Sequence, residues 1–406
     1  MLLTSRGRRI GGRVALGVVS TLVLGATGYA WSQLHRLDAS LVTADVISPS
    51  GRVPAEQIGQ PLQTAQNILL VGLDSRTDAN GYPLPQNVLD ALHAGDSTDG
   101  GDTTDTMIVV HIPVGGAAAT AISIPRDSYV DIAGGLGKHK INSAYSRAKA
   151  NAKSTLSAQG LSGPQLEVQA NEAGAKSAIQ TVEQFTGLTI NHYAAVNLAG
   201  FYALSNAVGG VEVCLKAPVH DSYSGADFPA GQQSLSGAQA LAFVRQRHDL
   251  PNGDLDRIAR QQAFLSSMAK NVLGAGTLTN PAKLDALMSA VQGSVVLDKG
   301  WDVLSFARQL RGLSSGSIGF ATIPVQSLSL QTPYDGDAVQ VDPAQVREFV
   351  RTALATPAVT ASSESASQGT GVRPVANTST PSTSSTPAEP PSLSSPRVSS
   401  ASGCVN

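Results

Sequence analysis

The stretch Asn67-Ile68-Leu69-Leu70-Val71-Gly72 opens the folded part of the chain and decides its class. This apolar run ends at a glycine and is too short for an independent helix, so it predicts a buried strand. Two more apolar runs follow at 106–112 and 120–124, each bounded by polar, glycine or proline residues. Such boundaries are typical of strands. The three runs therefore predict the start of a sheet.

Helical patterns alternate with strand patterns further along the chain. Apolar residues recur at helical spacing over 171–186, and Gly187 ends that helix. Residues 191–197 and 211–215 predict strands on either side of a helix at 198–208. Strands that alternate with helices indicate an α/β fold, with helices flanking a central mixed sheet.

The N-terminal region predicts a membrane anchor. Residues 1–13 carry a basic cluster, and residues 14–31 form an uncharged apolar run of 18 residues. That length is near the lower limit for a transmembrane helix, and the preceding positive charges place the N-terminus in the cytoplasm. A cleaved signal peptide is the alternative, since Gly28 and Ala30 are small, although the run exceeds the usual apolar length of about 7–15 residues. With a retained anchor or a cleaved signal peptide, the rest of the chain is expected to leave the cytoplasm.

The remainder divides into three parts by composition. Residues 32–66 have few apolar runs and predict an extracytoplasmic stalk, and residues 67–355 predict one large catalytic domain. A polar insert at about 75–104 is long enough to be functional or mobile. Residues 356–406 are rich in Ser, Thr, Pro and Ala. Because such a stretch buries too little apolar area to offset its ordering entropy, this tail is expected to be disordered.

Charge and cysteine content narrow the function classes. The net charge is −2, and no long basic tract lies beyond the first 13 residues, so nucleic acid is not an expected partner. The two cysteines, Cys214 and Cys404, have the number needed for one disulfide in an oxidising compartment. The sequence leaves open whether they pair or remain free thiols.

Two aspartates flank the predicted strands. Asp74 follows the first apolar run, and Asp105 directly precedes the second. Ligands of α/β folds bind at the carboxyl ends of strands, and two carboxylates on neighbouring strands can share a Mg²⁺ ion together with substrate phosphates. A single aspartate at such a place is more often a turn or cap residue, so the metal hypothesis depends on the pair.

Arginines gather in two segments. Arg126 follows Pro125 at a strand exit, where a guanidinium suits a phosphate oxygen, although an ion pair with Asp127 is the simpler alternative. A helix over 255–272 places part of a second set on one face. That set is Arg245, Arg247, Arg257, Arg260 and Gln261. Arginines outnumber acids there, and a pyrophosphate is the natural anion to neutralise them.

Other catalytic designs are missing from the sequence. It has no Walker loop, no His-Glu-x-x-His pair and no cysteine pair at zinc spacing. His248 is the one histidine inside a motif, and a structural role is at least as plausible for it.

Together these segments resemble the LytR-CpsA-Psr family, most closely its actinobacterial members. The resemblance runs from about 67 to 273 and continues weakly to about 355. Its markers are Asn67–Arg76, Thr104–Met107, Ser123–Asp127, Lys140–Tyr145, Val208–Val211, Arg245-x-Arg247 and Asp254-x-x-Arg257-x-x-Arg260-Gln261-Gln262. Each marker is modest alone, but their joint presence in this order is specific.

The resemblance implies an αβα domain with an apolar pocket for a polyprenyl chain, held outside the cell membrane by a single span. It implies Mg²⁺-dependent transfer of a polyprenyl-pyrophosphate-linked glycan, of arabinogalactan type in actinobacteria, onto peptidoglycan, with release of polyprenyl phosphate. A polyprenyl-pyrophosphate hydrolase and a non-enzymatic wall-binding or regulatory protein remain as alternatives.

By residue, the resemblance places Asp74 and Asp105 at the Mg²⁺. It assigns to the pyrophosphate the residues Arg126, Arg245, Arg247, Arg257 and Gln261, with Asp254 supporting the arginines. Arg260, which the predicted helix brings near Arg257 and Gln261, is expected as a further contact. Residues 101–104 lack an arginine that many members carry there, and Arg76 is a candidate replacement. Asp127 is either the general base or only the orienting partner of Arg126.

Overall fold

The computed structural model describes residues 41–54, 63–96, 101–116, 118–273, 280–302, 306, 318–355 and 403–406. The basic segment predicted at 1–13 and the membrane span predicted at 14–31 lie outside these residues. Among the helices that are described, none combines the length and the hydrophobicity needed to cross a membrane.

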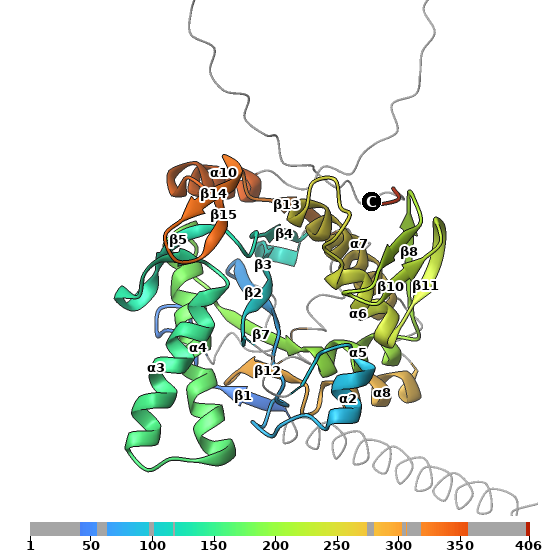
Figure 1. The fold of residues 1–406 in the computed structure, drawn as a ribbon. Helices are drawn as coiled ribbons and strands as arrows, with labels where there is room; N and C mark the ends of the chain where they lie inside the picture. The colour runs from blue at the N-terminus through green and yellow to red at the C-terminus, as the bar shows by residue number, and fades with distance from the viewer. Residues whose placement is uncertain are drawn as a thin grey trace, which may run out of the picture.

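A mixed sheet of seven described strands forms the centre of the domain (Figure 1). Its order is β1 (Val42–Ala44), β12 (Val295–Asp298), β7 (His192–Asn197), β2 (Gln66–Leu73), β3 (Thr104–Ile112), β4 (Thr120–Ser123) and β13 (Gly319–Thr322). The central strand β2 pairs antiparallel with β3 and parallel with β7. The predicted mixed sheet is therefore confirmed, and the three apolar runs are its adjacent strands β2, β3 and β4.

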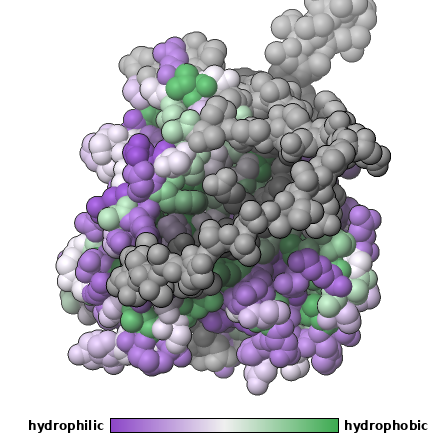
Figure 2. All heavy atoms as spheres, turned by 90° about the horizontal axis from the view of Figure 1, so that it is seen from above, coloured by the Kyte–Doolittle hydropathy of each residue, from purple (hydrophilic) through white to green (hydrophobic). Residues whose placement is uncertain are grey.

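Helices cover both faces of this sheet (Figure 1). One face carries α3 (Ser143–Ala158), α4 (Gly163–Thr186) and α10 (Pro343–Ala355). The other carries α5 (Leu198–Ala207), α6 (Gly237–Arg245), α7 (Asp254–Leu273) and α8 (Pro281–Val291). On the first face, Leu69 and Val71 of β2 pack with Ile179 and Val182 of α4 in the largest apolar cluster. A view from above shows a mostly hydrophilic rim and hydrophobic residues toward the centre (Figure 2).

Short elements complete the domain. They are α2 (Gln86–Ala91), the 3₁₀ turns Val114–Gly116 and Ala133–Gly135, and the hairpin strands β5 (Tyr129–Ile132), β6 (Gly137–Lys140), β8 (Val211–Leu215), β9 (Val219–Asp221), β10 (Ala226–Phe228), β11 (Gly231–Leu235), β14 (Ser327–Thr332) and β15 (Gly336–Gln340). The strand predicted at 211–215 is present as β8, but it pairs with β11 in a separate two-stranded antiparallel sheet.

Part of the predicted stalk belongs to the folded domain. β1 pairs in parallel with β12 at the edge of the sheet, and Ala44, Val46 and Ile47 are buried in the main core. The domain therefore begins before residue 67, where its start was predicted. A strand of three residues is too short to leave a periodic pattern in the sequence.

The end of the predicted disordered tail also packs on the domain. Cys404 forms a disulfide with Cys214 of β8, which settles the question that the sequence left open. Val405 is buried beside Leu215, its N–H donates to the Cys214 carbonyl at 2.9 Å, and its carbonyl accepts from the Lys216 N–H at 2.8 Å. Val405 therefore forms a single parallel β-bridge with Leu215 of β8. Residues 356–402 lie outside the described part of the chain.

Loss of this disulfide is expected to destabilise the protein measurably. Cys404→Ser should lower the free energy of unfolding by about 2–4 kcal/mol, because the bond closes a long loop in the unfolded chain. Denaturant titration of the wild type and the variant, with and without reductant, measures the effect. Cys214→Ser/Cys404→Ser should lose no more than the single variant and should not respond to reductant. A double variant that reductant still destabilises would contradict the assignment.

A buried lysine links α3 to α4. Lys149 donates to Asp102 at 2.7 Å and pairs with Glu167, which Lys153 also contacts at 2.8 Å. Burial raises the pKa of the Glu167 carboxyl, but its bonds to the two lysines outweigh that effect and lower the pKa overall. The ionised carboxylate is thus part of the folded state.

Glu167→Gln is expected to reduce stability by about 3 kcal/mol at neutral pH, because a buried ion pair loses one partner. Since the folded protein lowers the pKa of Glu167, its contribution is complete above the ordinary value of 4.5 and disappears as pH falls through the folded-state pKa. Urea titrations at a series of pH values should show the gap between wild type and variant closing below that value. The exposed Glu348→Gln serves as the control, and a gap independent of pH would contradict the prediction.

Candidate active site

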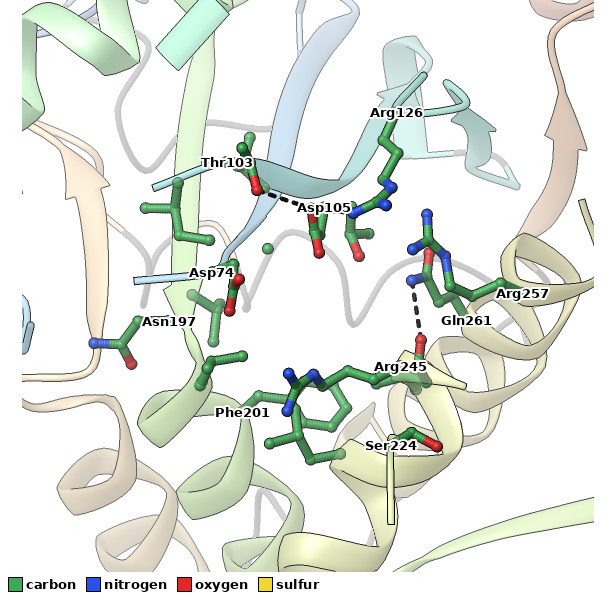
Figure 3. Close-up of a pocket in the computed structure, with 18 of the residues that line it drawn as sticks. Asp74, Thr103, Asp105, Arg126, Asn197, Phe201, Ser224, Arg245, Arg257 and Gln261 are labelled. Atoms are coloured by element: carbon green, nitrogen blue, oxygen red, sulfur yellow. Dashed lines mark hydrogen bonds and ion pairs between the residues drawn. The ribbon is translucent and has the colours of Figure 1, made fainter. Parts of the chain in front are cut away.

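A cavity of about 400 Å³ lies between the second face of the sheet and helices α5, α6 and α7 (Figure 3). Alternate residues of the central strands line its sheet side: Leu70, Gly72, Thr106, Ile108, Ala194 and Val196. This alternation follows from the strand period of two: the intervening Leu69 packs in the opposite core, and Val71, which packs there too, also borders the cavity.

Helix α7 supplies one stripe of the opposite wall. Arg257, Gln261 and Leu265 line the cavity and stand four residues apart, so they share one face of the helix. Phe201 of α5 and Leu241 and Val244 of α6 complete the apolar part of the wall. The cavity therefore combines an extensive apolar lining with charged groups.

The two predicted carboxylates come together at one end of the cavity. Asp74 follows β2 and its N–H donates to the Thr103 carbonyl at 3.0 Å, while Asp105 lies in the neighbouring strand β3. Both residues line the cavity and point toward the same space (Figure 3). Asp74 pairs with Arg76 at 2.5 Å. The register of β2 and β3 thus brings together side chains 31 positions apart in the sequence.

Asp105 is held as a carboxylate by its neighbours. Its Oδ1 accepts from the Arg126 guanidinium at 2.6 Å and from the Thr103 hydroxyl at 3.0 Å. Burial raises the pKa of Asp105, but the charges of Arg126 and Arg257 together with these hydrogen bonds lower it overall. The group is therefore an anion at neutral pH.

Two arginines face this carboxylate from different elements. Arg126 extends from the end of β4, and Arg257 lies in the first turn of α7, where it pairs with Asp254. Burial lowers the pKa of the Arg257 guanidinium and raises that of the Asp254 carboxyl. The Nε atoms of Arg126 and Arg257 are buried and have no hydrogen-bond acceptor among the described residues. An oxyanion in the cavity suits these donors.

The remaining polar groups sit on α6 and just beyond it. Arg245, the last residue of α6, donates to the carbonyls of Leu92 at 3.1 Å and His93 at 3.3 Å, and burial lowers its pKa. Gln261 donates to the Val244 carbonyl at 3.2 Å. The segment after Arg245 leaves the helix, so Arg247 lies exposed at the rim of the cavity.

Three predicted side chains stand behind the cavity wall. Asp127 lies 3.6 Å from Arg126 and 3.5 Å from Lys140. Asp254 pairs with Arg257. Arg76 is buried beside Asp74 and donates to the Ala94 carbonyl at 2.7 Å. None of the three lines the cavity.

The expectation that Arg260 shares the anion site is wrong. Its guanidinium is buried between α6 and the C-terminal segment, where it donates to Gln246 and to the Asn406 carbonyl and lies 5.3 Å from the Phe243 ring. Burial lowers its pKa to about 10. One helical turn carries both arginines, but only Arg257 faces the cavity, because three residues rotate a helix by less than a full turn.

The structure adds residues that were not predicted. Asn197 lines the cavity and its side chain caps α5, accepting from the Gly200 N–H at 2.7 Å. An asparagine just before a predicted helix is a recognisable capping signal. Asp221 at the end of β9, and Tyr223 and Ser224 in the loop that follows it, also reach the cavity, and no sequence pattern indicated them.

Fold and site together define an αβα domain whose cavity joins an apolar wall to a cluster of arginines and two carboxylates. The family model described as LytR_cpsA_psr matches residues 45–352, and the chain belongs to this family. The family resemblance seen in the sequence is thereby confirmed.

Known proteins similar to this chain agree with that assignment. The cell wall biosynthesis protein LcpA of Corynebacterium glutamicum is 46% identical over 343 residues, which cover 84% of this chain and 65% of LcpA. A protein of Enterococcus faecalis named polyisoprenyl-teichoic acid–peptidoglycan teichoic acid transferase TagU is 28% identical over 73% of this chain and 82% of its own length. The structure of Bacillus subtilis TagV shares the fold, with a TM-score of 0.51 at 24% identity over 72% of this chain and 97% of TagV.

Proposed function

We propose that this protein transfers a polyprenyl-pyrophosphate-linked glycan to peptidoglycan and releases polyprenyl phosphate. The observation that carries the proposal is one cavity with an apolar wall and, at one end, Arg126, Arg245, Arg257 and two carboxylates. A lipid pyrophosphate has the same two parts. The name of the similar protein TagU, a polyisoprenyl-teichoic acid–peptidoglycan teichoic acid transferase, supports the same chemistry.

The donor would lie with its isoprenoid chain against the apolar wall. Leu70, Ile108, Val196, Phe201 and Leu265 offer a lining without polar side-chain atoms, and burying a chain there removes apolar area from water. Its pyrophosphate would accept hydrogen bonds from Arg126, Arg245 and Arg257, whose forked guanidinium groups match phosphate oxygens. Arg247 and Gln261 would add contacts at the rim and on the wall.

We propose Asp74 and Asp105 as the Mg²⁺ ligands. Within the described residues no set of three His, Cys, Asp or Glu side chains surrounds a metal position. Two carboxylates nevertheless fit Mg²⁺, which keeps several waters and takes further oxygens from substrate phosphates. A bound Mg²⁺ would neutralise charge on the pyrophosphate oxygens.

In this mechanism an acceptor hydroxyl attacks the phosphorus nearer the glycan. A new P–O bond forms to peptidoglycan, and the bond to the bridging oxygen breaks. Polyprenyl phosphate departs with the bond's electrons, and the hydroxyl proton passes to solvent. The arginines contribute by placing positive charge where negative charge develops. Asp127 and Asp254, which lie behind the wall, would orient Arg126 and Arg257.

We propose that the domain works outside the cytoplasm, anchored by the span predicted at 14–31. The disulfide between Cys214 and Cys404 supports an oxidising compartment. The pyrophosphate linkage stores the energy for transfer, so no nucleotide is required there. An arabinogalactan-type polymer is the proposed glycan, in keeping with the similarity to a corynebacterial wall protein.

The full-length protein in detergent tests the proposal with a lipid-pyrophosphate-glycan donor and a peptidoglycan acceptor. Release of polyprenyl phosphate together with glycan on the acceptor, dependent on Mg²⁺, is the expected result. Release without labelled acceptor would favour the hydrolase. Tight donor binding with no release would overturn the enzymatic proposal in favour of a binding or regulatory protein.

A further inference from the structure

The rim of the cavity has an unusual composition. Of the described residues that line the cavity, three are exposed: Tyr223, Arg247 and His248. Tyr223 is 77% exposed although it also reaches the cavity. Exposure alone is ordinary for a tyrosine, but this ring also borders the cavity, so it is accessible to a ligand that emerges from it.

Buried Asp221 fixes the loop that carries Tyr223. Its Oδ1 accepts from the Tyr223 N–H at 3.0 Å, and its Oδ2 accepts from the Ser224 hydroxyl at 2.9 Å. The same carboxylate lies 3.4 Å from His248 Nδ1. One carboxylate therefore ties the loop between β9 and β10 to the segment after α6.

The two exposed rings support each other. The centroids of Tyr223 and His248 are 4.2 Å apart, with an angle of 32° between their planes. Partial stacking of this kind restricts the tyrosine ring without burying it. A restrained ring loses less conformational entropy when a ligand packs on it.

We propose that Tyr223, supported by His248, is the stacking platform for the first sugar of the donor glycan. This inference rests on the proposed function. The first sugar is bonded directly to the pyrophosphate. If the arginines bind the phosphates, the sugar lies next to Arg247. Arg247 and Tyr223 share the same rim, and the sugar therefore meets the ring as it leaves the cavity.

The chemistry of the two surfaces matches. One face of a pyranose ring presents C–H groups, and its hydroxyls project from the edge. A tyrosine ring covers the C–H face with apolar area, while its hydroxyl and the neighbouring imidazole remain available to the sugar hydroxyls. Such a platform recognises the presence of a sugar more strongly than its identity.

Two short-chain probes separate this role from phosphate binding: farnesyl pyrophosphate and farnesyl-pyrophosphoryl-N-acetylglucosamine. Calorimetric titration of the full-length protein in detergent with Mg²⁺ gives the affinity for each. Tyr223→Ala should weaken binding of the sugar-bearing probe about five- to tenfold and leave binding of the sugar-free probe unchanged. Tyr223→Phe should behave as the wild type, because the ring remains.

Tyr334→Ala is the matched control, since this tyrosine is 84% exposed and does not line the cavity. Equal weakening of both probes by Tyr223→Ala would overturn the platform, as would no weakening of either. A change confined to the KM for peptidoglycan would assign the ring to the acceptor and overturn the donor role. A wild-type protein that binds neither probe would refute the proposed function itself.

Discussion

Replacing Arg257 by alanine is expected to reduce glycan transfer about 100- to 1000-fold. The side chain faces the cavity from α7, is 2% exposed and has a buried Nε without an acceptor among the described residues. Removing one preorganised donor to a developing oxyanion typically has an effect of that size. The loss should appear mainly in kcat, because the charge that Arg257 contacts grows toward the transition state.

The fold should survive this substitution. Asp254 loses its partner, but its pKa is already raised by burial, so the carboxyl can take up a proton instead of remaining a buried unpaired anion. Arg257→Lys keeps a positive charge but loses the planar guanidinium that donates two hydrogen bonds to a phosphate. It should therefore recover only a small part of the activity. Circular dichroism and thermal unfolding separate loss of activity from loss of structure.

Arg351→Ala provides the matched control, because this arginine is exposed on α10 and its one ion pair among the described residues is with neighbouring Glu348. It should transfer glycan at the wild-type rate. Wild-type activity in a folded Arg257→Ala variant would exclude a role for Arg257 of α7 in binding the pyrophosphate.

Replacing Asp105 by asparagine is expected to reduce glycan transfer by a similar factor, because it weakens Mg²⁺ binding. An asparagine oxygen can still accept from Arg126 and Thr103, so the shape of the site is preserved while the negative charge is lost. Metal affinity depends on that charge, and activity at low Mg²⁺ should fall at least 100-fold. Titration of the transfer rate against Mg²⁺ measures the change, and partial recovery at high Mg²⁺ is expected.

The partner residue supplies a sharper test. If Asp74 and Asp105 bind one ion, Asp74→Asn/Asp105→Asn should lose little more activity than either single variant, because residues that act as a unit are not additive. Exposed Asp227→Asn is the control and should change nothing. Losses that multiply in the double variant, or a Mg²⁺ dependence unchanged in Asp105→Asn, would contradict a shared metal site.

Much of the fold could be predicted because the relevant signals are local. The run at 67–72 is apolar and short, and it became the central strand β2. The helix predicted at 255–272 is α7, and its helical period placed Arg257 and Gln261 on one face. Arginines in excess of acids indicated an anion site without any knowledge of tertiary contacts.

Other features left no local signal. β1 contributes three residues whose strand pairing depends on β12, more than 250 positions later. Tyr223 lies in a loop with no periodicity, and its place at the rim follows from the bonds of Asp221. Arg257 and Arg260 looked equivalent in sequence, but Arg260 lies on another side of α7, where it meets the carbonyl of Asn406.

By itself, the sequence determined the class of fold, the order of its central strands along the chain and the chemical character of the site. Those properties follow from side-chain periodicity and residue type, which act over a few positions. Tertiary structure alone decided which polar groups meet. The approach of Asp74 to Asp105, the exclusion of Arg260 and the exposed ring at the rim depend on strand register and long-range packing, which local patterns do not encode.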